Sequence, residues 1–137
     1  MAKDIYHDTV KTALEKDGWT ITEELLRLTI GSRSVYIDLG AEKLIAAEKE
    51  GRKIAIEIKS FVSPSPVNDL ENALGQYILY RDALKRSQPQ RILYLAISDE
   101  VYLDFFQEEI AQMVIEEQKL KLIIFDANKA EVVKWIE

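Results

Sequence analysis

The sequence has 137 residues, 47% hydrophobic and 31% charged, which suits a single domain with a core of its own. It contains no cysteine and one histidine, which excludes disulfides, thiolate metal sites and zinc sites built on clustered histidines. Its formal net charge of -6 weighs against broad, non-specific phosphate binding but is compatible with a small basic patch. We treat residues 1–137 as one domain and expect a cytoplasmic protein without a signal peptide or membrane span.

The first half of the chain predicts one helix followed by strands. In order, the predicted elements are a helix at 4–16, an edge strand at 19–30, a strand at 34–39 and a strand at 53–60. The stretch 41–50 is helical in composition, but its place between two strands favours a further strand that turns at Glu50 and Gly51. Strict alternation in 53–60 puts Ile54, Ile56 and Ile58 on one face and Ala55, Glu57, Lys59 and Phe61 on the other.

The second half predicts alternating helices and strands. Ser65 and Pro66 form a typical helix start, as N-cap and first helical residue, for a helix that runs to Arg86. After it come a buried strand at 90–97, an amphipathic helix at 102–117, and strands at 120–125 and 132–136. This order predicts an α/β (α+β) fold with a central sheet of mixed direction flanked by helices.

Three polar side chains interrupt the apolar strands of the first half. Asp38 lies near the end of the predicted strand 34–39, and Glu57 and Lys59 lie near the end of the next strong strand. Two carboxylates on neighbouring strands suit Mg²⁺, or Mn²⁺, which prefers oxygen ligands, and the carbonyl of Ile58 would add another oxygen. The ammonium of Lys59 would orient an attacking water and offset charge on a phosphate.

A second interpretation stays open at each of these positions. Glu57 and Lys59 also fit a same-face ion pair on a half-exposed strand, which contributes little to stability. Gln76 and Tyr80 lie four residues apart on one face of the predicted long helix and also fit ordinary helix packing. In favour of a site, burying such polar groups costs free energy unless a ligand or partner compensates.

Other stretches carry weaker signals. Arg81, Lys85 and Arg86 concentrate positive charge near one helix end, together with Arg91, and are a candidate DNA contact. His7 on the first helix is expected to be a surface or capping residue. An apolar stripe is predicted to be core or, alternatively, a partner surface; it comprises Tyr102, Phe105, Phe106, Ile110 and Met113.

Taken together, Asp38, then Glu57-Ile58-Lys59, then Gln76 and Tyr80 on the following helix resemble the PD-(D/E)XK nuclease superfamily. The resemblance implies a restriction-endonuclease-like core. It implies that Asp38, Glu57, Lys59 and Gln76 are catalytic and that Asp38 and Glu57 bind the metal. Asp8 and Tyr80 would have supporting roles. The chain departs from the pattern at Ile37, where the superfamily often has proline.

Nearly the whole chain resembles the XisH family, the fdxN element excision controlling factors of cyanobacteria. The stretches that carry the likeness are IYHDTVKTALEKDGWTIT, VYIDLGAEKLIAAEK, IAIEIKSF and ALGQYILYRDAL. The resemblance implies an accessory role in excising a DNA element during heterocyst development, with a companion (XisI-like) excision factor and a recombinase. Two hypotheses follow: a Mg²⁺-dependent factor that cleaves or processes DNA, and a non-catalytic nuclease-fold module that acts through its partner. Pairing of the exposed last strand predicts a homodimer or hetero-complex.

Overall fold

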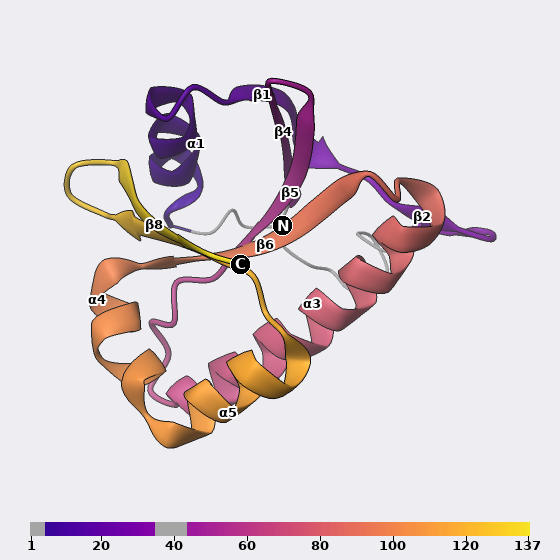
Figure 1. Ribbon diagram of the computed structural model, residues 1–137. Helices are drawn as coiled ribbons and strands as arrows, with labels where there is room; N and C mark the ends of the chain where they lie inside the picture. Colours follow the sequence, from indigo (N-terminus) through magenta and orange to yellow (C-terminus); the bar gives the residue numbers. More distant parts are fainter. Residues whose placement is uncertain (1–4, 35–43) are drawn as a thin grey trace.

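The computed structural model describes residues 5–34 and 44–137 and is built on one six-stranded sheet (Figure 1). Its strands, in spatial order, are β1 (Thr20–Leu26), β4 (Leu44–Lys49), β5 (Arg52–Ile58), β6 (Arg91–Ser98), β7 (Leu122–Asp126) and β8 (Glu131–Ile136). The three strands β5, β6 and β7 run parallel, and each remaining neighbouring pair is antiparallel. The predicted α/β fold with a mixed sheet is confirmed.

Helices cover both faces of this sheet (Figure 1). They are α1 (His7–Lys16), α3 (Pro66–Ser87), α4 (Asp99–Leu103), the 3-10 turn η1 (Phe105–Gln107) and α5 (Glu109–Gln118). α1 packs on one face, while α3, η1 and α5 pack on the other, so the core forms two clusters on either side of the sheet. Among the described residues, no helix combines the length and apolar character needed to cross a bilayer.

Alternation along β5 assigns its side chains to the two clusters. Ile54, Ile56 and Ile58 are buried with α1, as predicted. Ala55 is buried with α3, and Phe61 packs against that same cluster. Full burial of one such aliphatic side chain stabilises the fold by about 1.5–3 kcal/mol. The apolar alternation therefore fixes which face of β5 turns toward α3.

The start of α3 follows from its sequence. The hydroxyl of Ser65 accepts a hydrogen bond from the backbone N–H of Asn68 at 3.2 Å, and Pro66 takes the first helical position. Proline is favoured there because its missing N–H would have no partner inside the helix. The predicted N-cap is confirmed, and the helix ends one residue beyond the predicted Arg86.

Three predicted elements of the first half have different outcomes. Within the stretch 41–50, Leu44–Lys49 forms strand β4, which confirms the strand interpretation. The predicted edge strand at 19–30 is split, because β1 ends at Leu26 and a small hairpin of β2 (Thr29–Ile30) and β3 (Arg33–Ser34) follows. The predicted strand at 34–39 lies outside the described residues beyond its first residue.

The single helix predicted at 102–117 is wrong. Helix α4 begins early, because the Ser98 hydroxyl caps it by accepting the N–H of Val101 at 3.3 Å. The backbone then leaves the helical region at Asp104 and again at Glu108. Those breaks let Phe105 and Phe106 turn into the α3 cluster. The hydrophobic periodicity of the sequence could not predict these breaks, because both phenylalanines also fit the apolar stripe of one continuous helix.

Candidate functional site

Glu57 is a buried carboxylate on the α3 face of the sheet. It is the residue before Ile58, the last residue of β5, and it pairs with Leu95 of β6. By the alternation of the strand, its side chain lies on the same face of the sheet as that of Ala55. Only 2% of the residue is exposed, and both carboxylate oxygens are shielded from solvent. Such burial costs several kcal/mol unless other groups compensate, so a half-exposed ion pair does not describe Glu57.

The helix α3 places polar groups on the same side of the sheet. Tyr77 and Tyr80 are each 1% exposed in the cluster that α3 forms with β5 and β6. The amide oxygen of Gln76 is also buried and accepts no hydrogen bond within the described part of the chain. The predicted pair Gln76 and Tyr80 thus lies on the helix that covers Glu57, with buried polar atoms in an otherwise apolar layer.

Tyr77 hydrogen-bonds α3 to β6 and to the residue before β7, and the charge of Glu57 affects its pKa. Its hydroxyl donates to the carbonyl of Leu93 at 3.2 Å and accepts the N–H of Lys121 at 3.1 Å. Burial raises the pKa of Tyr77, and the charge of Glu57 raises it further, while the Lys121 N–H and the Arg81 charge lower it. The phenol therefore stays protonated at neutral pH and keeps its bond to Leu93.

Lys59 follows directly after β5. Its backbone N–H donates to the carbonyl of Ala96 at 3.2 Å, which continues the pairing with β6 past the end of the strand. The side chain is half-buried and two residues beyond Glu57. The chain therefore holds the backbone of Lys59 in register at the carboxyl end of β5.

A metal site here would have oxygen ligands. Asp38 lies outside the described residues, so the structure places one of the two predicted metal ligands, Glu57. Across residues 5–34 and 44–137, no three or more Asp, Glu or His side chains are grouped to hold a metal ion. The shielded carboxylate of Glu57 and the carbonyl of Ile58 are nevertheless the hard oxygen donors that Mg²⁺ takes, so these donors fit the ion chemically.

The first helix lies across the sheet from Glu57. α1 packs on the opposite face, and Asp8 is exposed on it. His7, expected at the surface or as a cap, is instead buried at 3% exposure, and Tyr6 takes the N-cap position. The correction follows from spacing: His7, Val10 and Leu14 stand at positions i, i+3 and i+7, on the face that meets the sheet. The imidazole Nε2 lies 3.6 Å from a carboxylate oxygen of Glu24.

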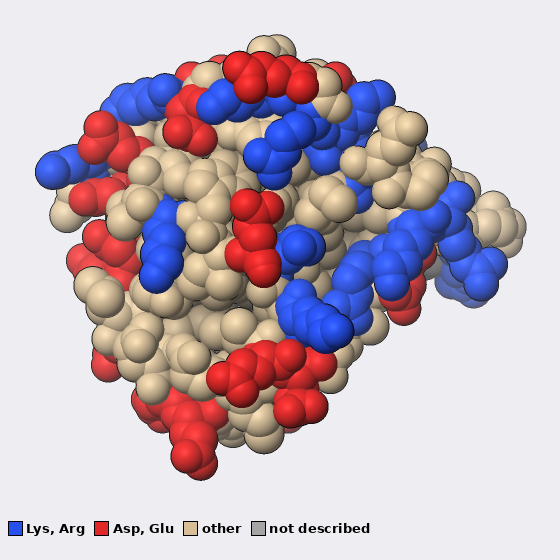
Figure 2. Space-filling view, in the orientation of Figure 1, with Lys and Arg blue, Asp and Glu red and all other residues tan. Residues whose placement is uncertain are grey.

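The basic residues of α3 divide into one anchored and two exposed side chains. Arg81 donates from Nη1 to the carbonyl of Gln118 at 2.8 Å, and its guanidinium carbon lies 5.6 Å from the centre of the Tyr77 ring. Lys85 and Arg86 are exposed. In the space-filling view, Lys and Arg gather over the C-terminal half of α3, while Asp and Glu gather near α5 (Figure 2).

Sequence reasoning missed residues that join this basic region from elsewhere. Lys119 and Lys121, between α5 and β7, lie beside Arg81 and Lys85 around one pocket that Tyr77 also lines. The four-residue spacing of Tyr77, Arg81 and Lys85 on α3 was the signal available in the sequence. Nothing in the sequence indicated that the end of α5 comes to the same place.

Comparison with known proteins gives consistent matches over nearly the whole chain. The family model described as XisH protein matches residues 1–133. An XisH family protein from Nostoc punctiforme PCC 73102 is similar in structure, with 44% identity and a TM-score of 0.90 over 98% of this chain and 100% of that chain. An fdxN element excision controlling factor protein from Anabaena variabilis is similar, with 40% identity, the same TM-score of 0.90, and coverage of 98% and 100%. No curated protein matches the chain.

Proposed function

The chain belongs to the XisH family, and we propose that it is an accessory factor that controls excision of a DNA element. The likeness to an fdxN element excision controlling factor over 98% of this chain supports the proposal. In this role it would act with a companion excision factor and a recombinase on DNA. Its formal net charge of -6 suits an accessory role, because it weighs against holding a long duplex through broad phosphate contacts.

The finer part of the proposal concerns the α3 face, where Glu57 would bind Mg²⁺. The observation that carries it is the burial of that carboxylate at 2% exposure, in a layer built mainly from aliphatic and aromatic side chains. Asp38, Glu57 and the carbonyl of Ile58 would hold the ion. When bound, Mg²⁺ supplies Lewis-acid stabilisation of charge on a phosphate. The proposal rests on the resemblance of Asp38, Glu57 and Lys59 to the PD-(D/E)XK motif.

Other residues of the chain would act around that ion. The ammonium of Lys59 would orient an attacking water and offset negative charge on the phosphate. Gln76, whose amide oxygen is buried on α3, would position the groups beside it. Tyr80 would support α3 against the sheet, where it is 1% exposed.

A cleavage assay tests the catalytic form of this proposal. Purified protein would be incubated with duplex, flapped and branched DNA in Mg²⁺ or Mn²⁺, and Lys59→Ala should reduce cleavage at least about 100-fold. Lys53→Ala is the matched control, since Lys53 is an exposed lysine near the start of β5, at the opposite end of the strand from Lys59. Absence of cleavage on every substrate, or equal cleavage by both variants, would remove the catalytic form.

A second candidate is a non-catalytic module that acts through its partner. Three exposed apolar side chains on α4 and α5 favour it: Leu103, Ile110 and Met113 are 70%, 40% and 53% exposed. A companion excision factor should then be retained on the immobilised chain despite Glu57→Ala and Lys59→Ala, and lost with Ile110→Ser and Met113→Ser. Retention that instead requires Glu57 would contradict this candidate.

A further inference from the structure

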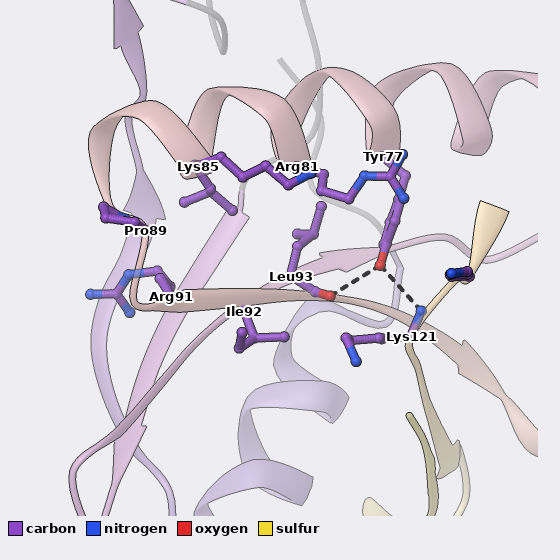
Figure 3. A pocket seen from close by; sticks show the side chains of 10 residues that line it. Tyr77, Arg81, Lys85, Pro89, Arg91, Ile92, Leu93 and Lys121 are labelled. Atoms are coloured by element: carbon purple, nitrogen blue, oxygen red, sulfur yellow. Dashed lines mark hydrogen bonds between the residues drawn. The ribbon is translucent and has the colours of Figure 1, made fainter.

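A basic pocket lies where α3 ends, β6 begins and α5 passes into β7 (Figure 3). Its volume is about 220 Å³. Five of the lining side chains are cationic: Arg81, Lys85, Arg91, Lys119 and Lys121. The other five, Tyr77, Leu84, Pro89, Ile92 and Leu93, give it a largely apolar wall, and no Asp or Glu from the described residues 5–34 and 44–137 lines it. This concentration of positive charge stands in a chain whose net charge is -6.

The two arginines of the pocket are held in place by the fold. Arg91 donates from Nε to the side chain of Gln88 at 2.7 Å and from Nη1 to the carbonyl of Ile54 at 3.0 Å. Arg81 donates from Nη1 to the carbonyl of Gln118 at 2.8 Å. A guanidinium has five N–H donors, so each has donors beyond those these bonds use. Fixed arginines lose little side-chain entropy when they bind an anion.

The apolar wall and the number of cations restrict the ligand. A carboxylate carries one negative charge, whereas a phosphate monoester carries close to two at neutral pH and presents three acceptor oxygens. Five cations without an acid therefore fit a terminal phosphate better than the side chain of an acidic peptide. The apolar side chains beside them, Leu84, Ile92 and Leu93, can contact a sugar or base attached to that phosphate.

We infer that this pocket binds the terminal phosphate of a nucleotide, with Arg81, Lys85 and Lys121 around the phosphate and the apolar wall against the attached nucleoside. Arg91 lies at the far end of the pocket (Figure 3). The nucleotide is either free or the phosphorylated end of a DNA strand. The site is separate from Glu57: the pocket reaches β6 at residues 91–93, and Glu57 pairs with Leu95 further along. The two positions on β6 are two residues, or about 7 Å, apart. The inference does not require a metal at Glu57.

Binding in the presence of EDTA tests the pocket apart from any metal-dependent activity. Calorimetry would compare a nucleoside 5′-monophosphate with the same nucleoside, and a 5′-phosphorylated single-stranded oligonucleotide with its 5′-hydroxyl form. The 5′-phosphate should raise affinity at least about tenfold in both pairs. Tighter binding of the phosphorylated oligonucleotide than of the mononucleotide identifies a strand end, and equal or weaker binding identifies a free nucleotide.

Three double variants locate the binding. Lys85→Ala with Lys121→Ala removes two pocket cations and should weaken the phosphorylated ligand at least about tenfold, while Lys85→Arg with Lys121→Arg should retain binding. Arg27→Ala with Lys129→Ala removes two exposed charges outside the pocket and should leave affinity within about twofold. Equal affinity for phosphorylated and unphosphorylated ligands would overturn the inference. So would an unaffected lysine-to-alanine variant, or preference for a glutamate-rich peptide. A melting temperature for each variant confirms that it is folded.

Discussion

The two faces of strand β5 have different chemistry although they belong to the same seven residues. Toward α1 the strand presents Ile54, Ile56 and Ile58, which are buried in an aliphatic and aromatic cluster. Toward α3 it presents Ala55 and then the buried carboxylate of Glu57. Ala55 and Glu57 bury less apolar surface than isoleucines would at the same positions. We therefore expect this face to contribute less to the free energy of folding than a fully aliphatic face.

This difference sets a face that packing explains against the face on which we propose a metal site. On the α1 face, packing alone explains Ile54, Ile56 and Ile58. On the α3 face, polar atoms of Glu57, Gln76 and Tyr77 lie inside the core. Proteins commonly keep such destabilising groups where function requires them. We expect truncation of an isoleucine on the α1 face to lower stability and replacement of the buried acid on the α3 face by an apolar side chain to raise it.

The largest expected effect is on the α1 face. Ile56→Ala should lower the free energy of unfolding by about 2–5 kcal/mol, because Ile56 is fully buried and the cavity cannot collapse easily. Urea unfolding of the wild type and the variant measures the loss. A change below about 1 kcal/mol would mean that this face is loosely packed.

A smaller effect is expected for a hydrogen-bonding tyrosine of the α3 face. Tyr77→Phe removes a hydroxyl that joins Leu93 and Lys121 and leaves two buried backbone groups without it. The free energy of unfolding should fall by about 1–3 kcal/mol. Leu79→Ala is a control on the same helix, because its side chain is 43% exposed, and it should change stability less. Equal losses for the two variants would show that the Tyr77 bonds are not formed in solution.

Replacing Glu57 by an apolar residue should raise the free energy of unfolding instead of lowering it. Glu57→Leu puts an apolar side chain of similar length in a buried position, so in EDTA it should raise the free energy of unfolding by about 1 kcal/mol. Thermal denaturation with and without Mg²⁺ separates stability from metal binding. A loss comparable to that of Ile56→Ala would contradict this contrast between the two faces of β5.

The smallest effect concerns alkaline pH and involves both faces. The pKa of Tyr77 is raised mainly by burial, and the pKa of Tyr94, on the α1 face, is raised by burial and by its hydrogen bond to Glu137. A phenol with a raised pKa in the folded state contributes fully below its ordinary value of 10.0, and that contribution is lost as pH rises above it. Stability should therefore fall above pH 10.

Phenylalanine variants assign that alkaline loss. Tyr94→Phe and Tyr77→Phe should each make the stability less dependent on pH above 10 while leaving the dependence near pH 7 unchanged. Urea titrations between pH 8 and about pH 11 measure the slopes. Slopes identical to that of the wild type would show that other groups cause the alkaline loss.

The sequence predicted most of the sheet but not the path between β6 and β7. Strict alternation in β5 and the Ser65-Pro66 helix start are local signals, and both are confirmed. The break at Asp104 depends on tertiary packing, because Phe105 and Phe106 fit either a helical stripe or a turn into the core. The burial of His7 was missed for a related reason: its helical spacing from Val10 outweighed the usual exposure of histidine.

The site could be predicted only in part. Glu57 stood out in the sequence as a carboxylate within an apolar strand. The four-residue spacing of Gln76 and Tyr80 predicted that they share one face of the helix α3. The basic pocket was not predicted, because Lys121 is far along the chain from Arg81 and only the end of α5 brings them together. Contacts of that kind depend on topology rather than on any local pattern.

Metal binding by Glu57 is the most direct test of the account. Calorimetric titration with Mn²⁺ and Mg²⁺ would compare the wild type with Glu57→Gln, which keeps the size of the side chain, and with Glu131→Gln, which removes an exposed charge on β8. The account predicts one bound ion per chain in the wild type and in Glu131→Gln, and none in Glu57→Gln. Equal binding by Glu57→Gln and the wild type would contradict it.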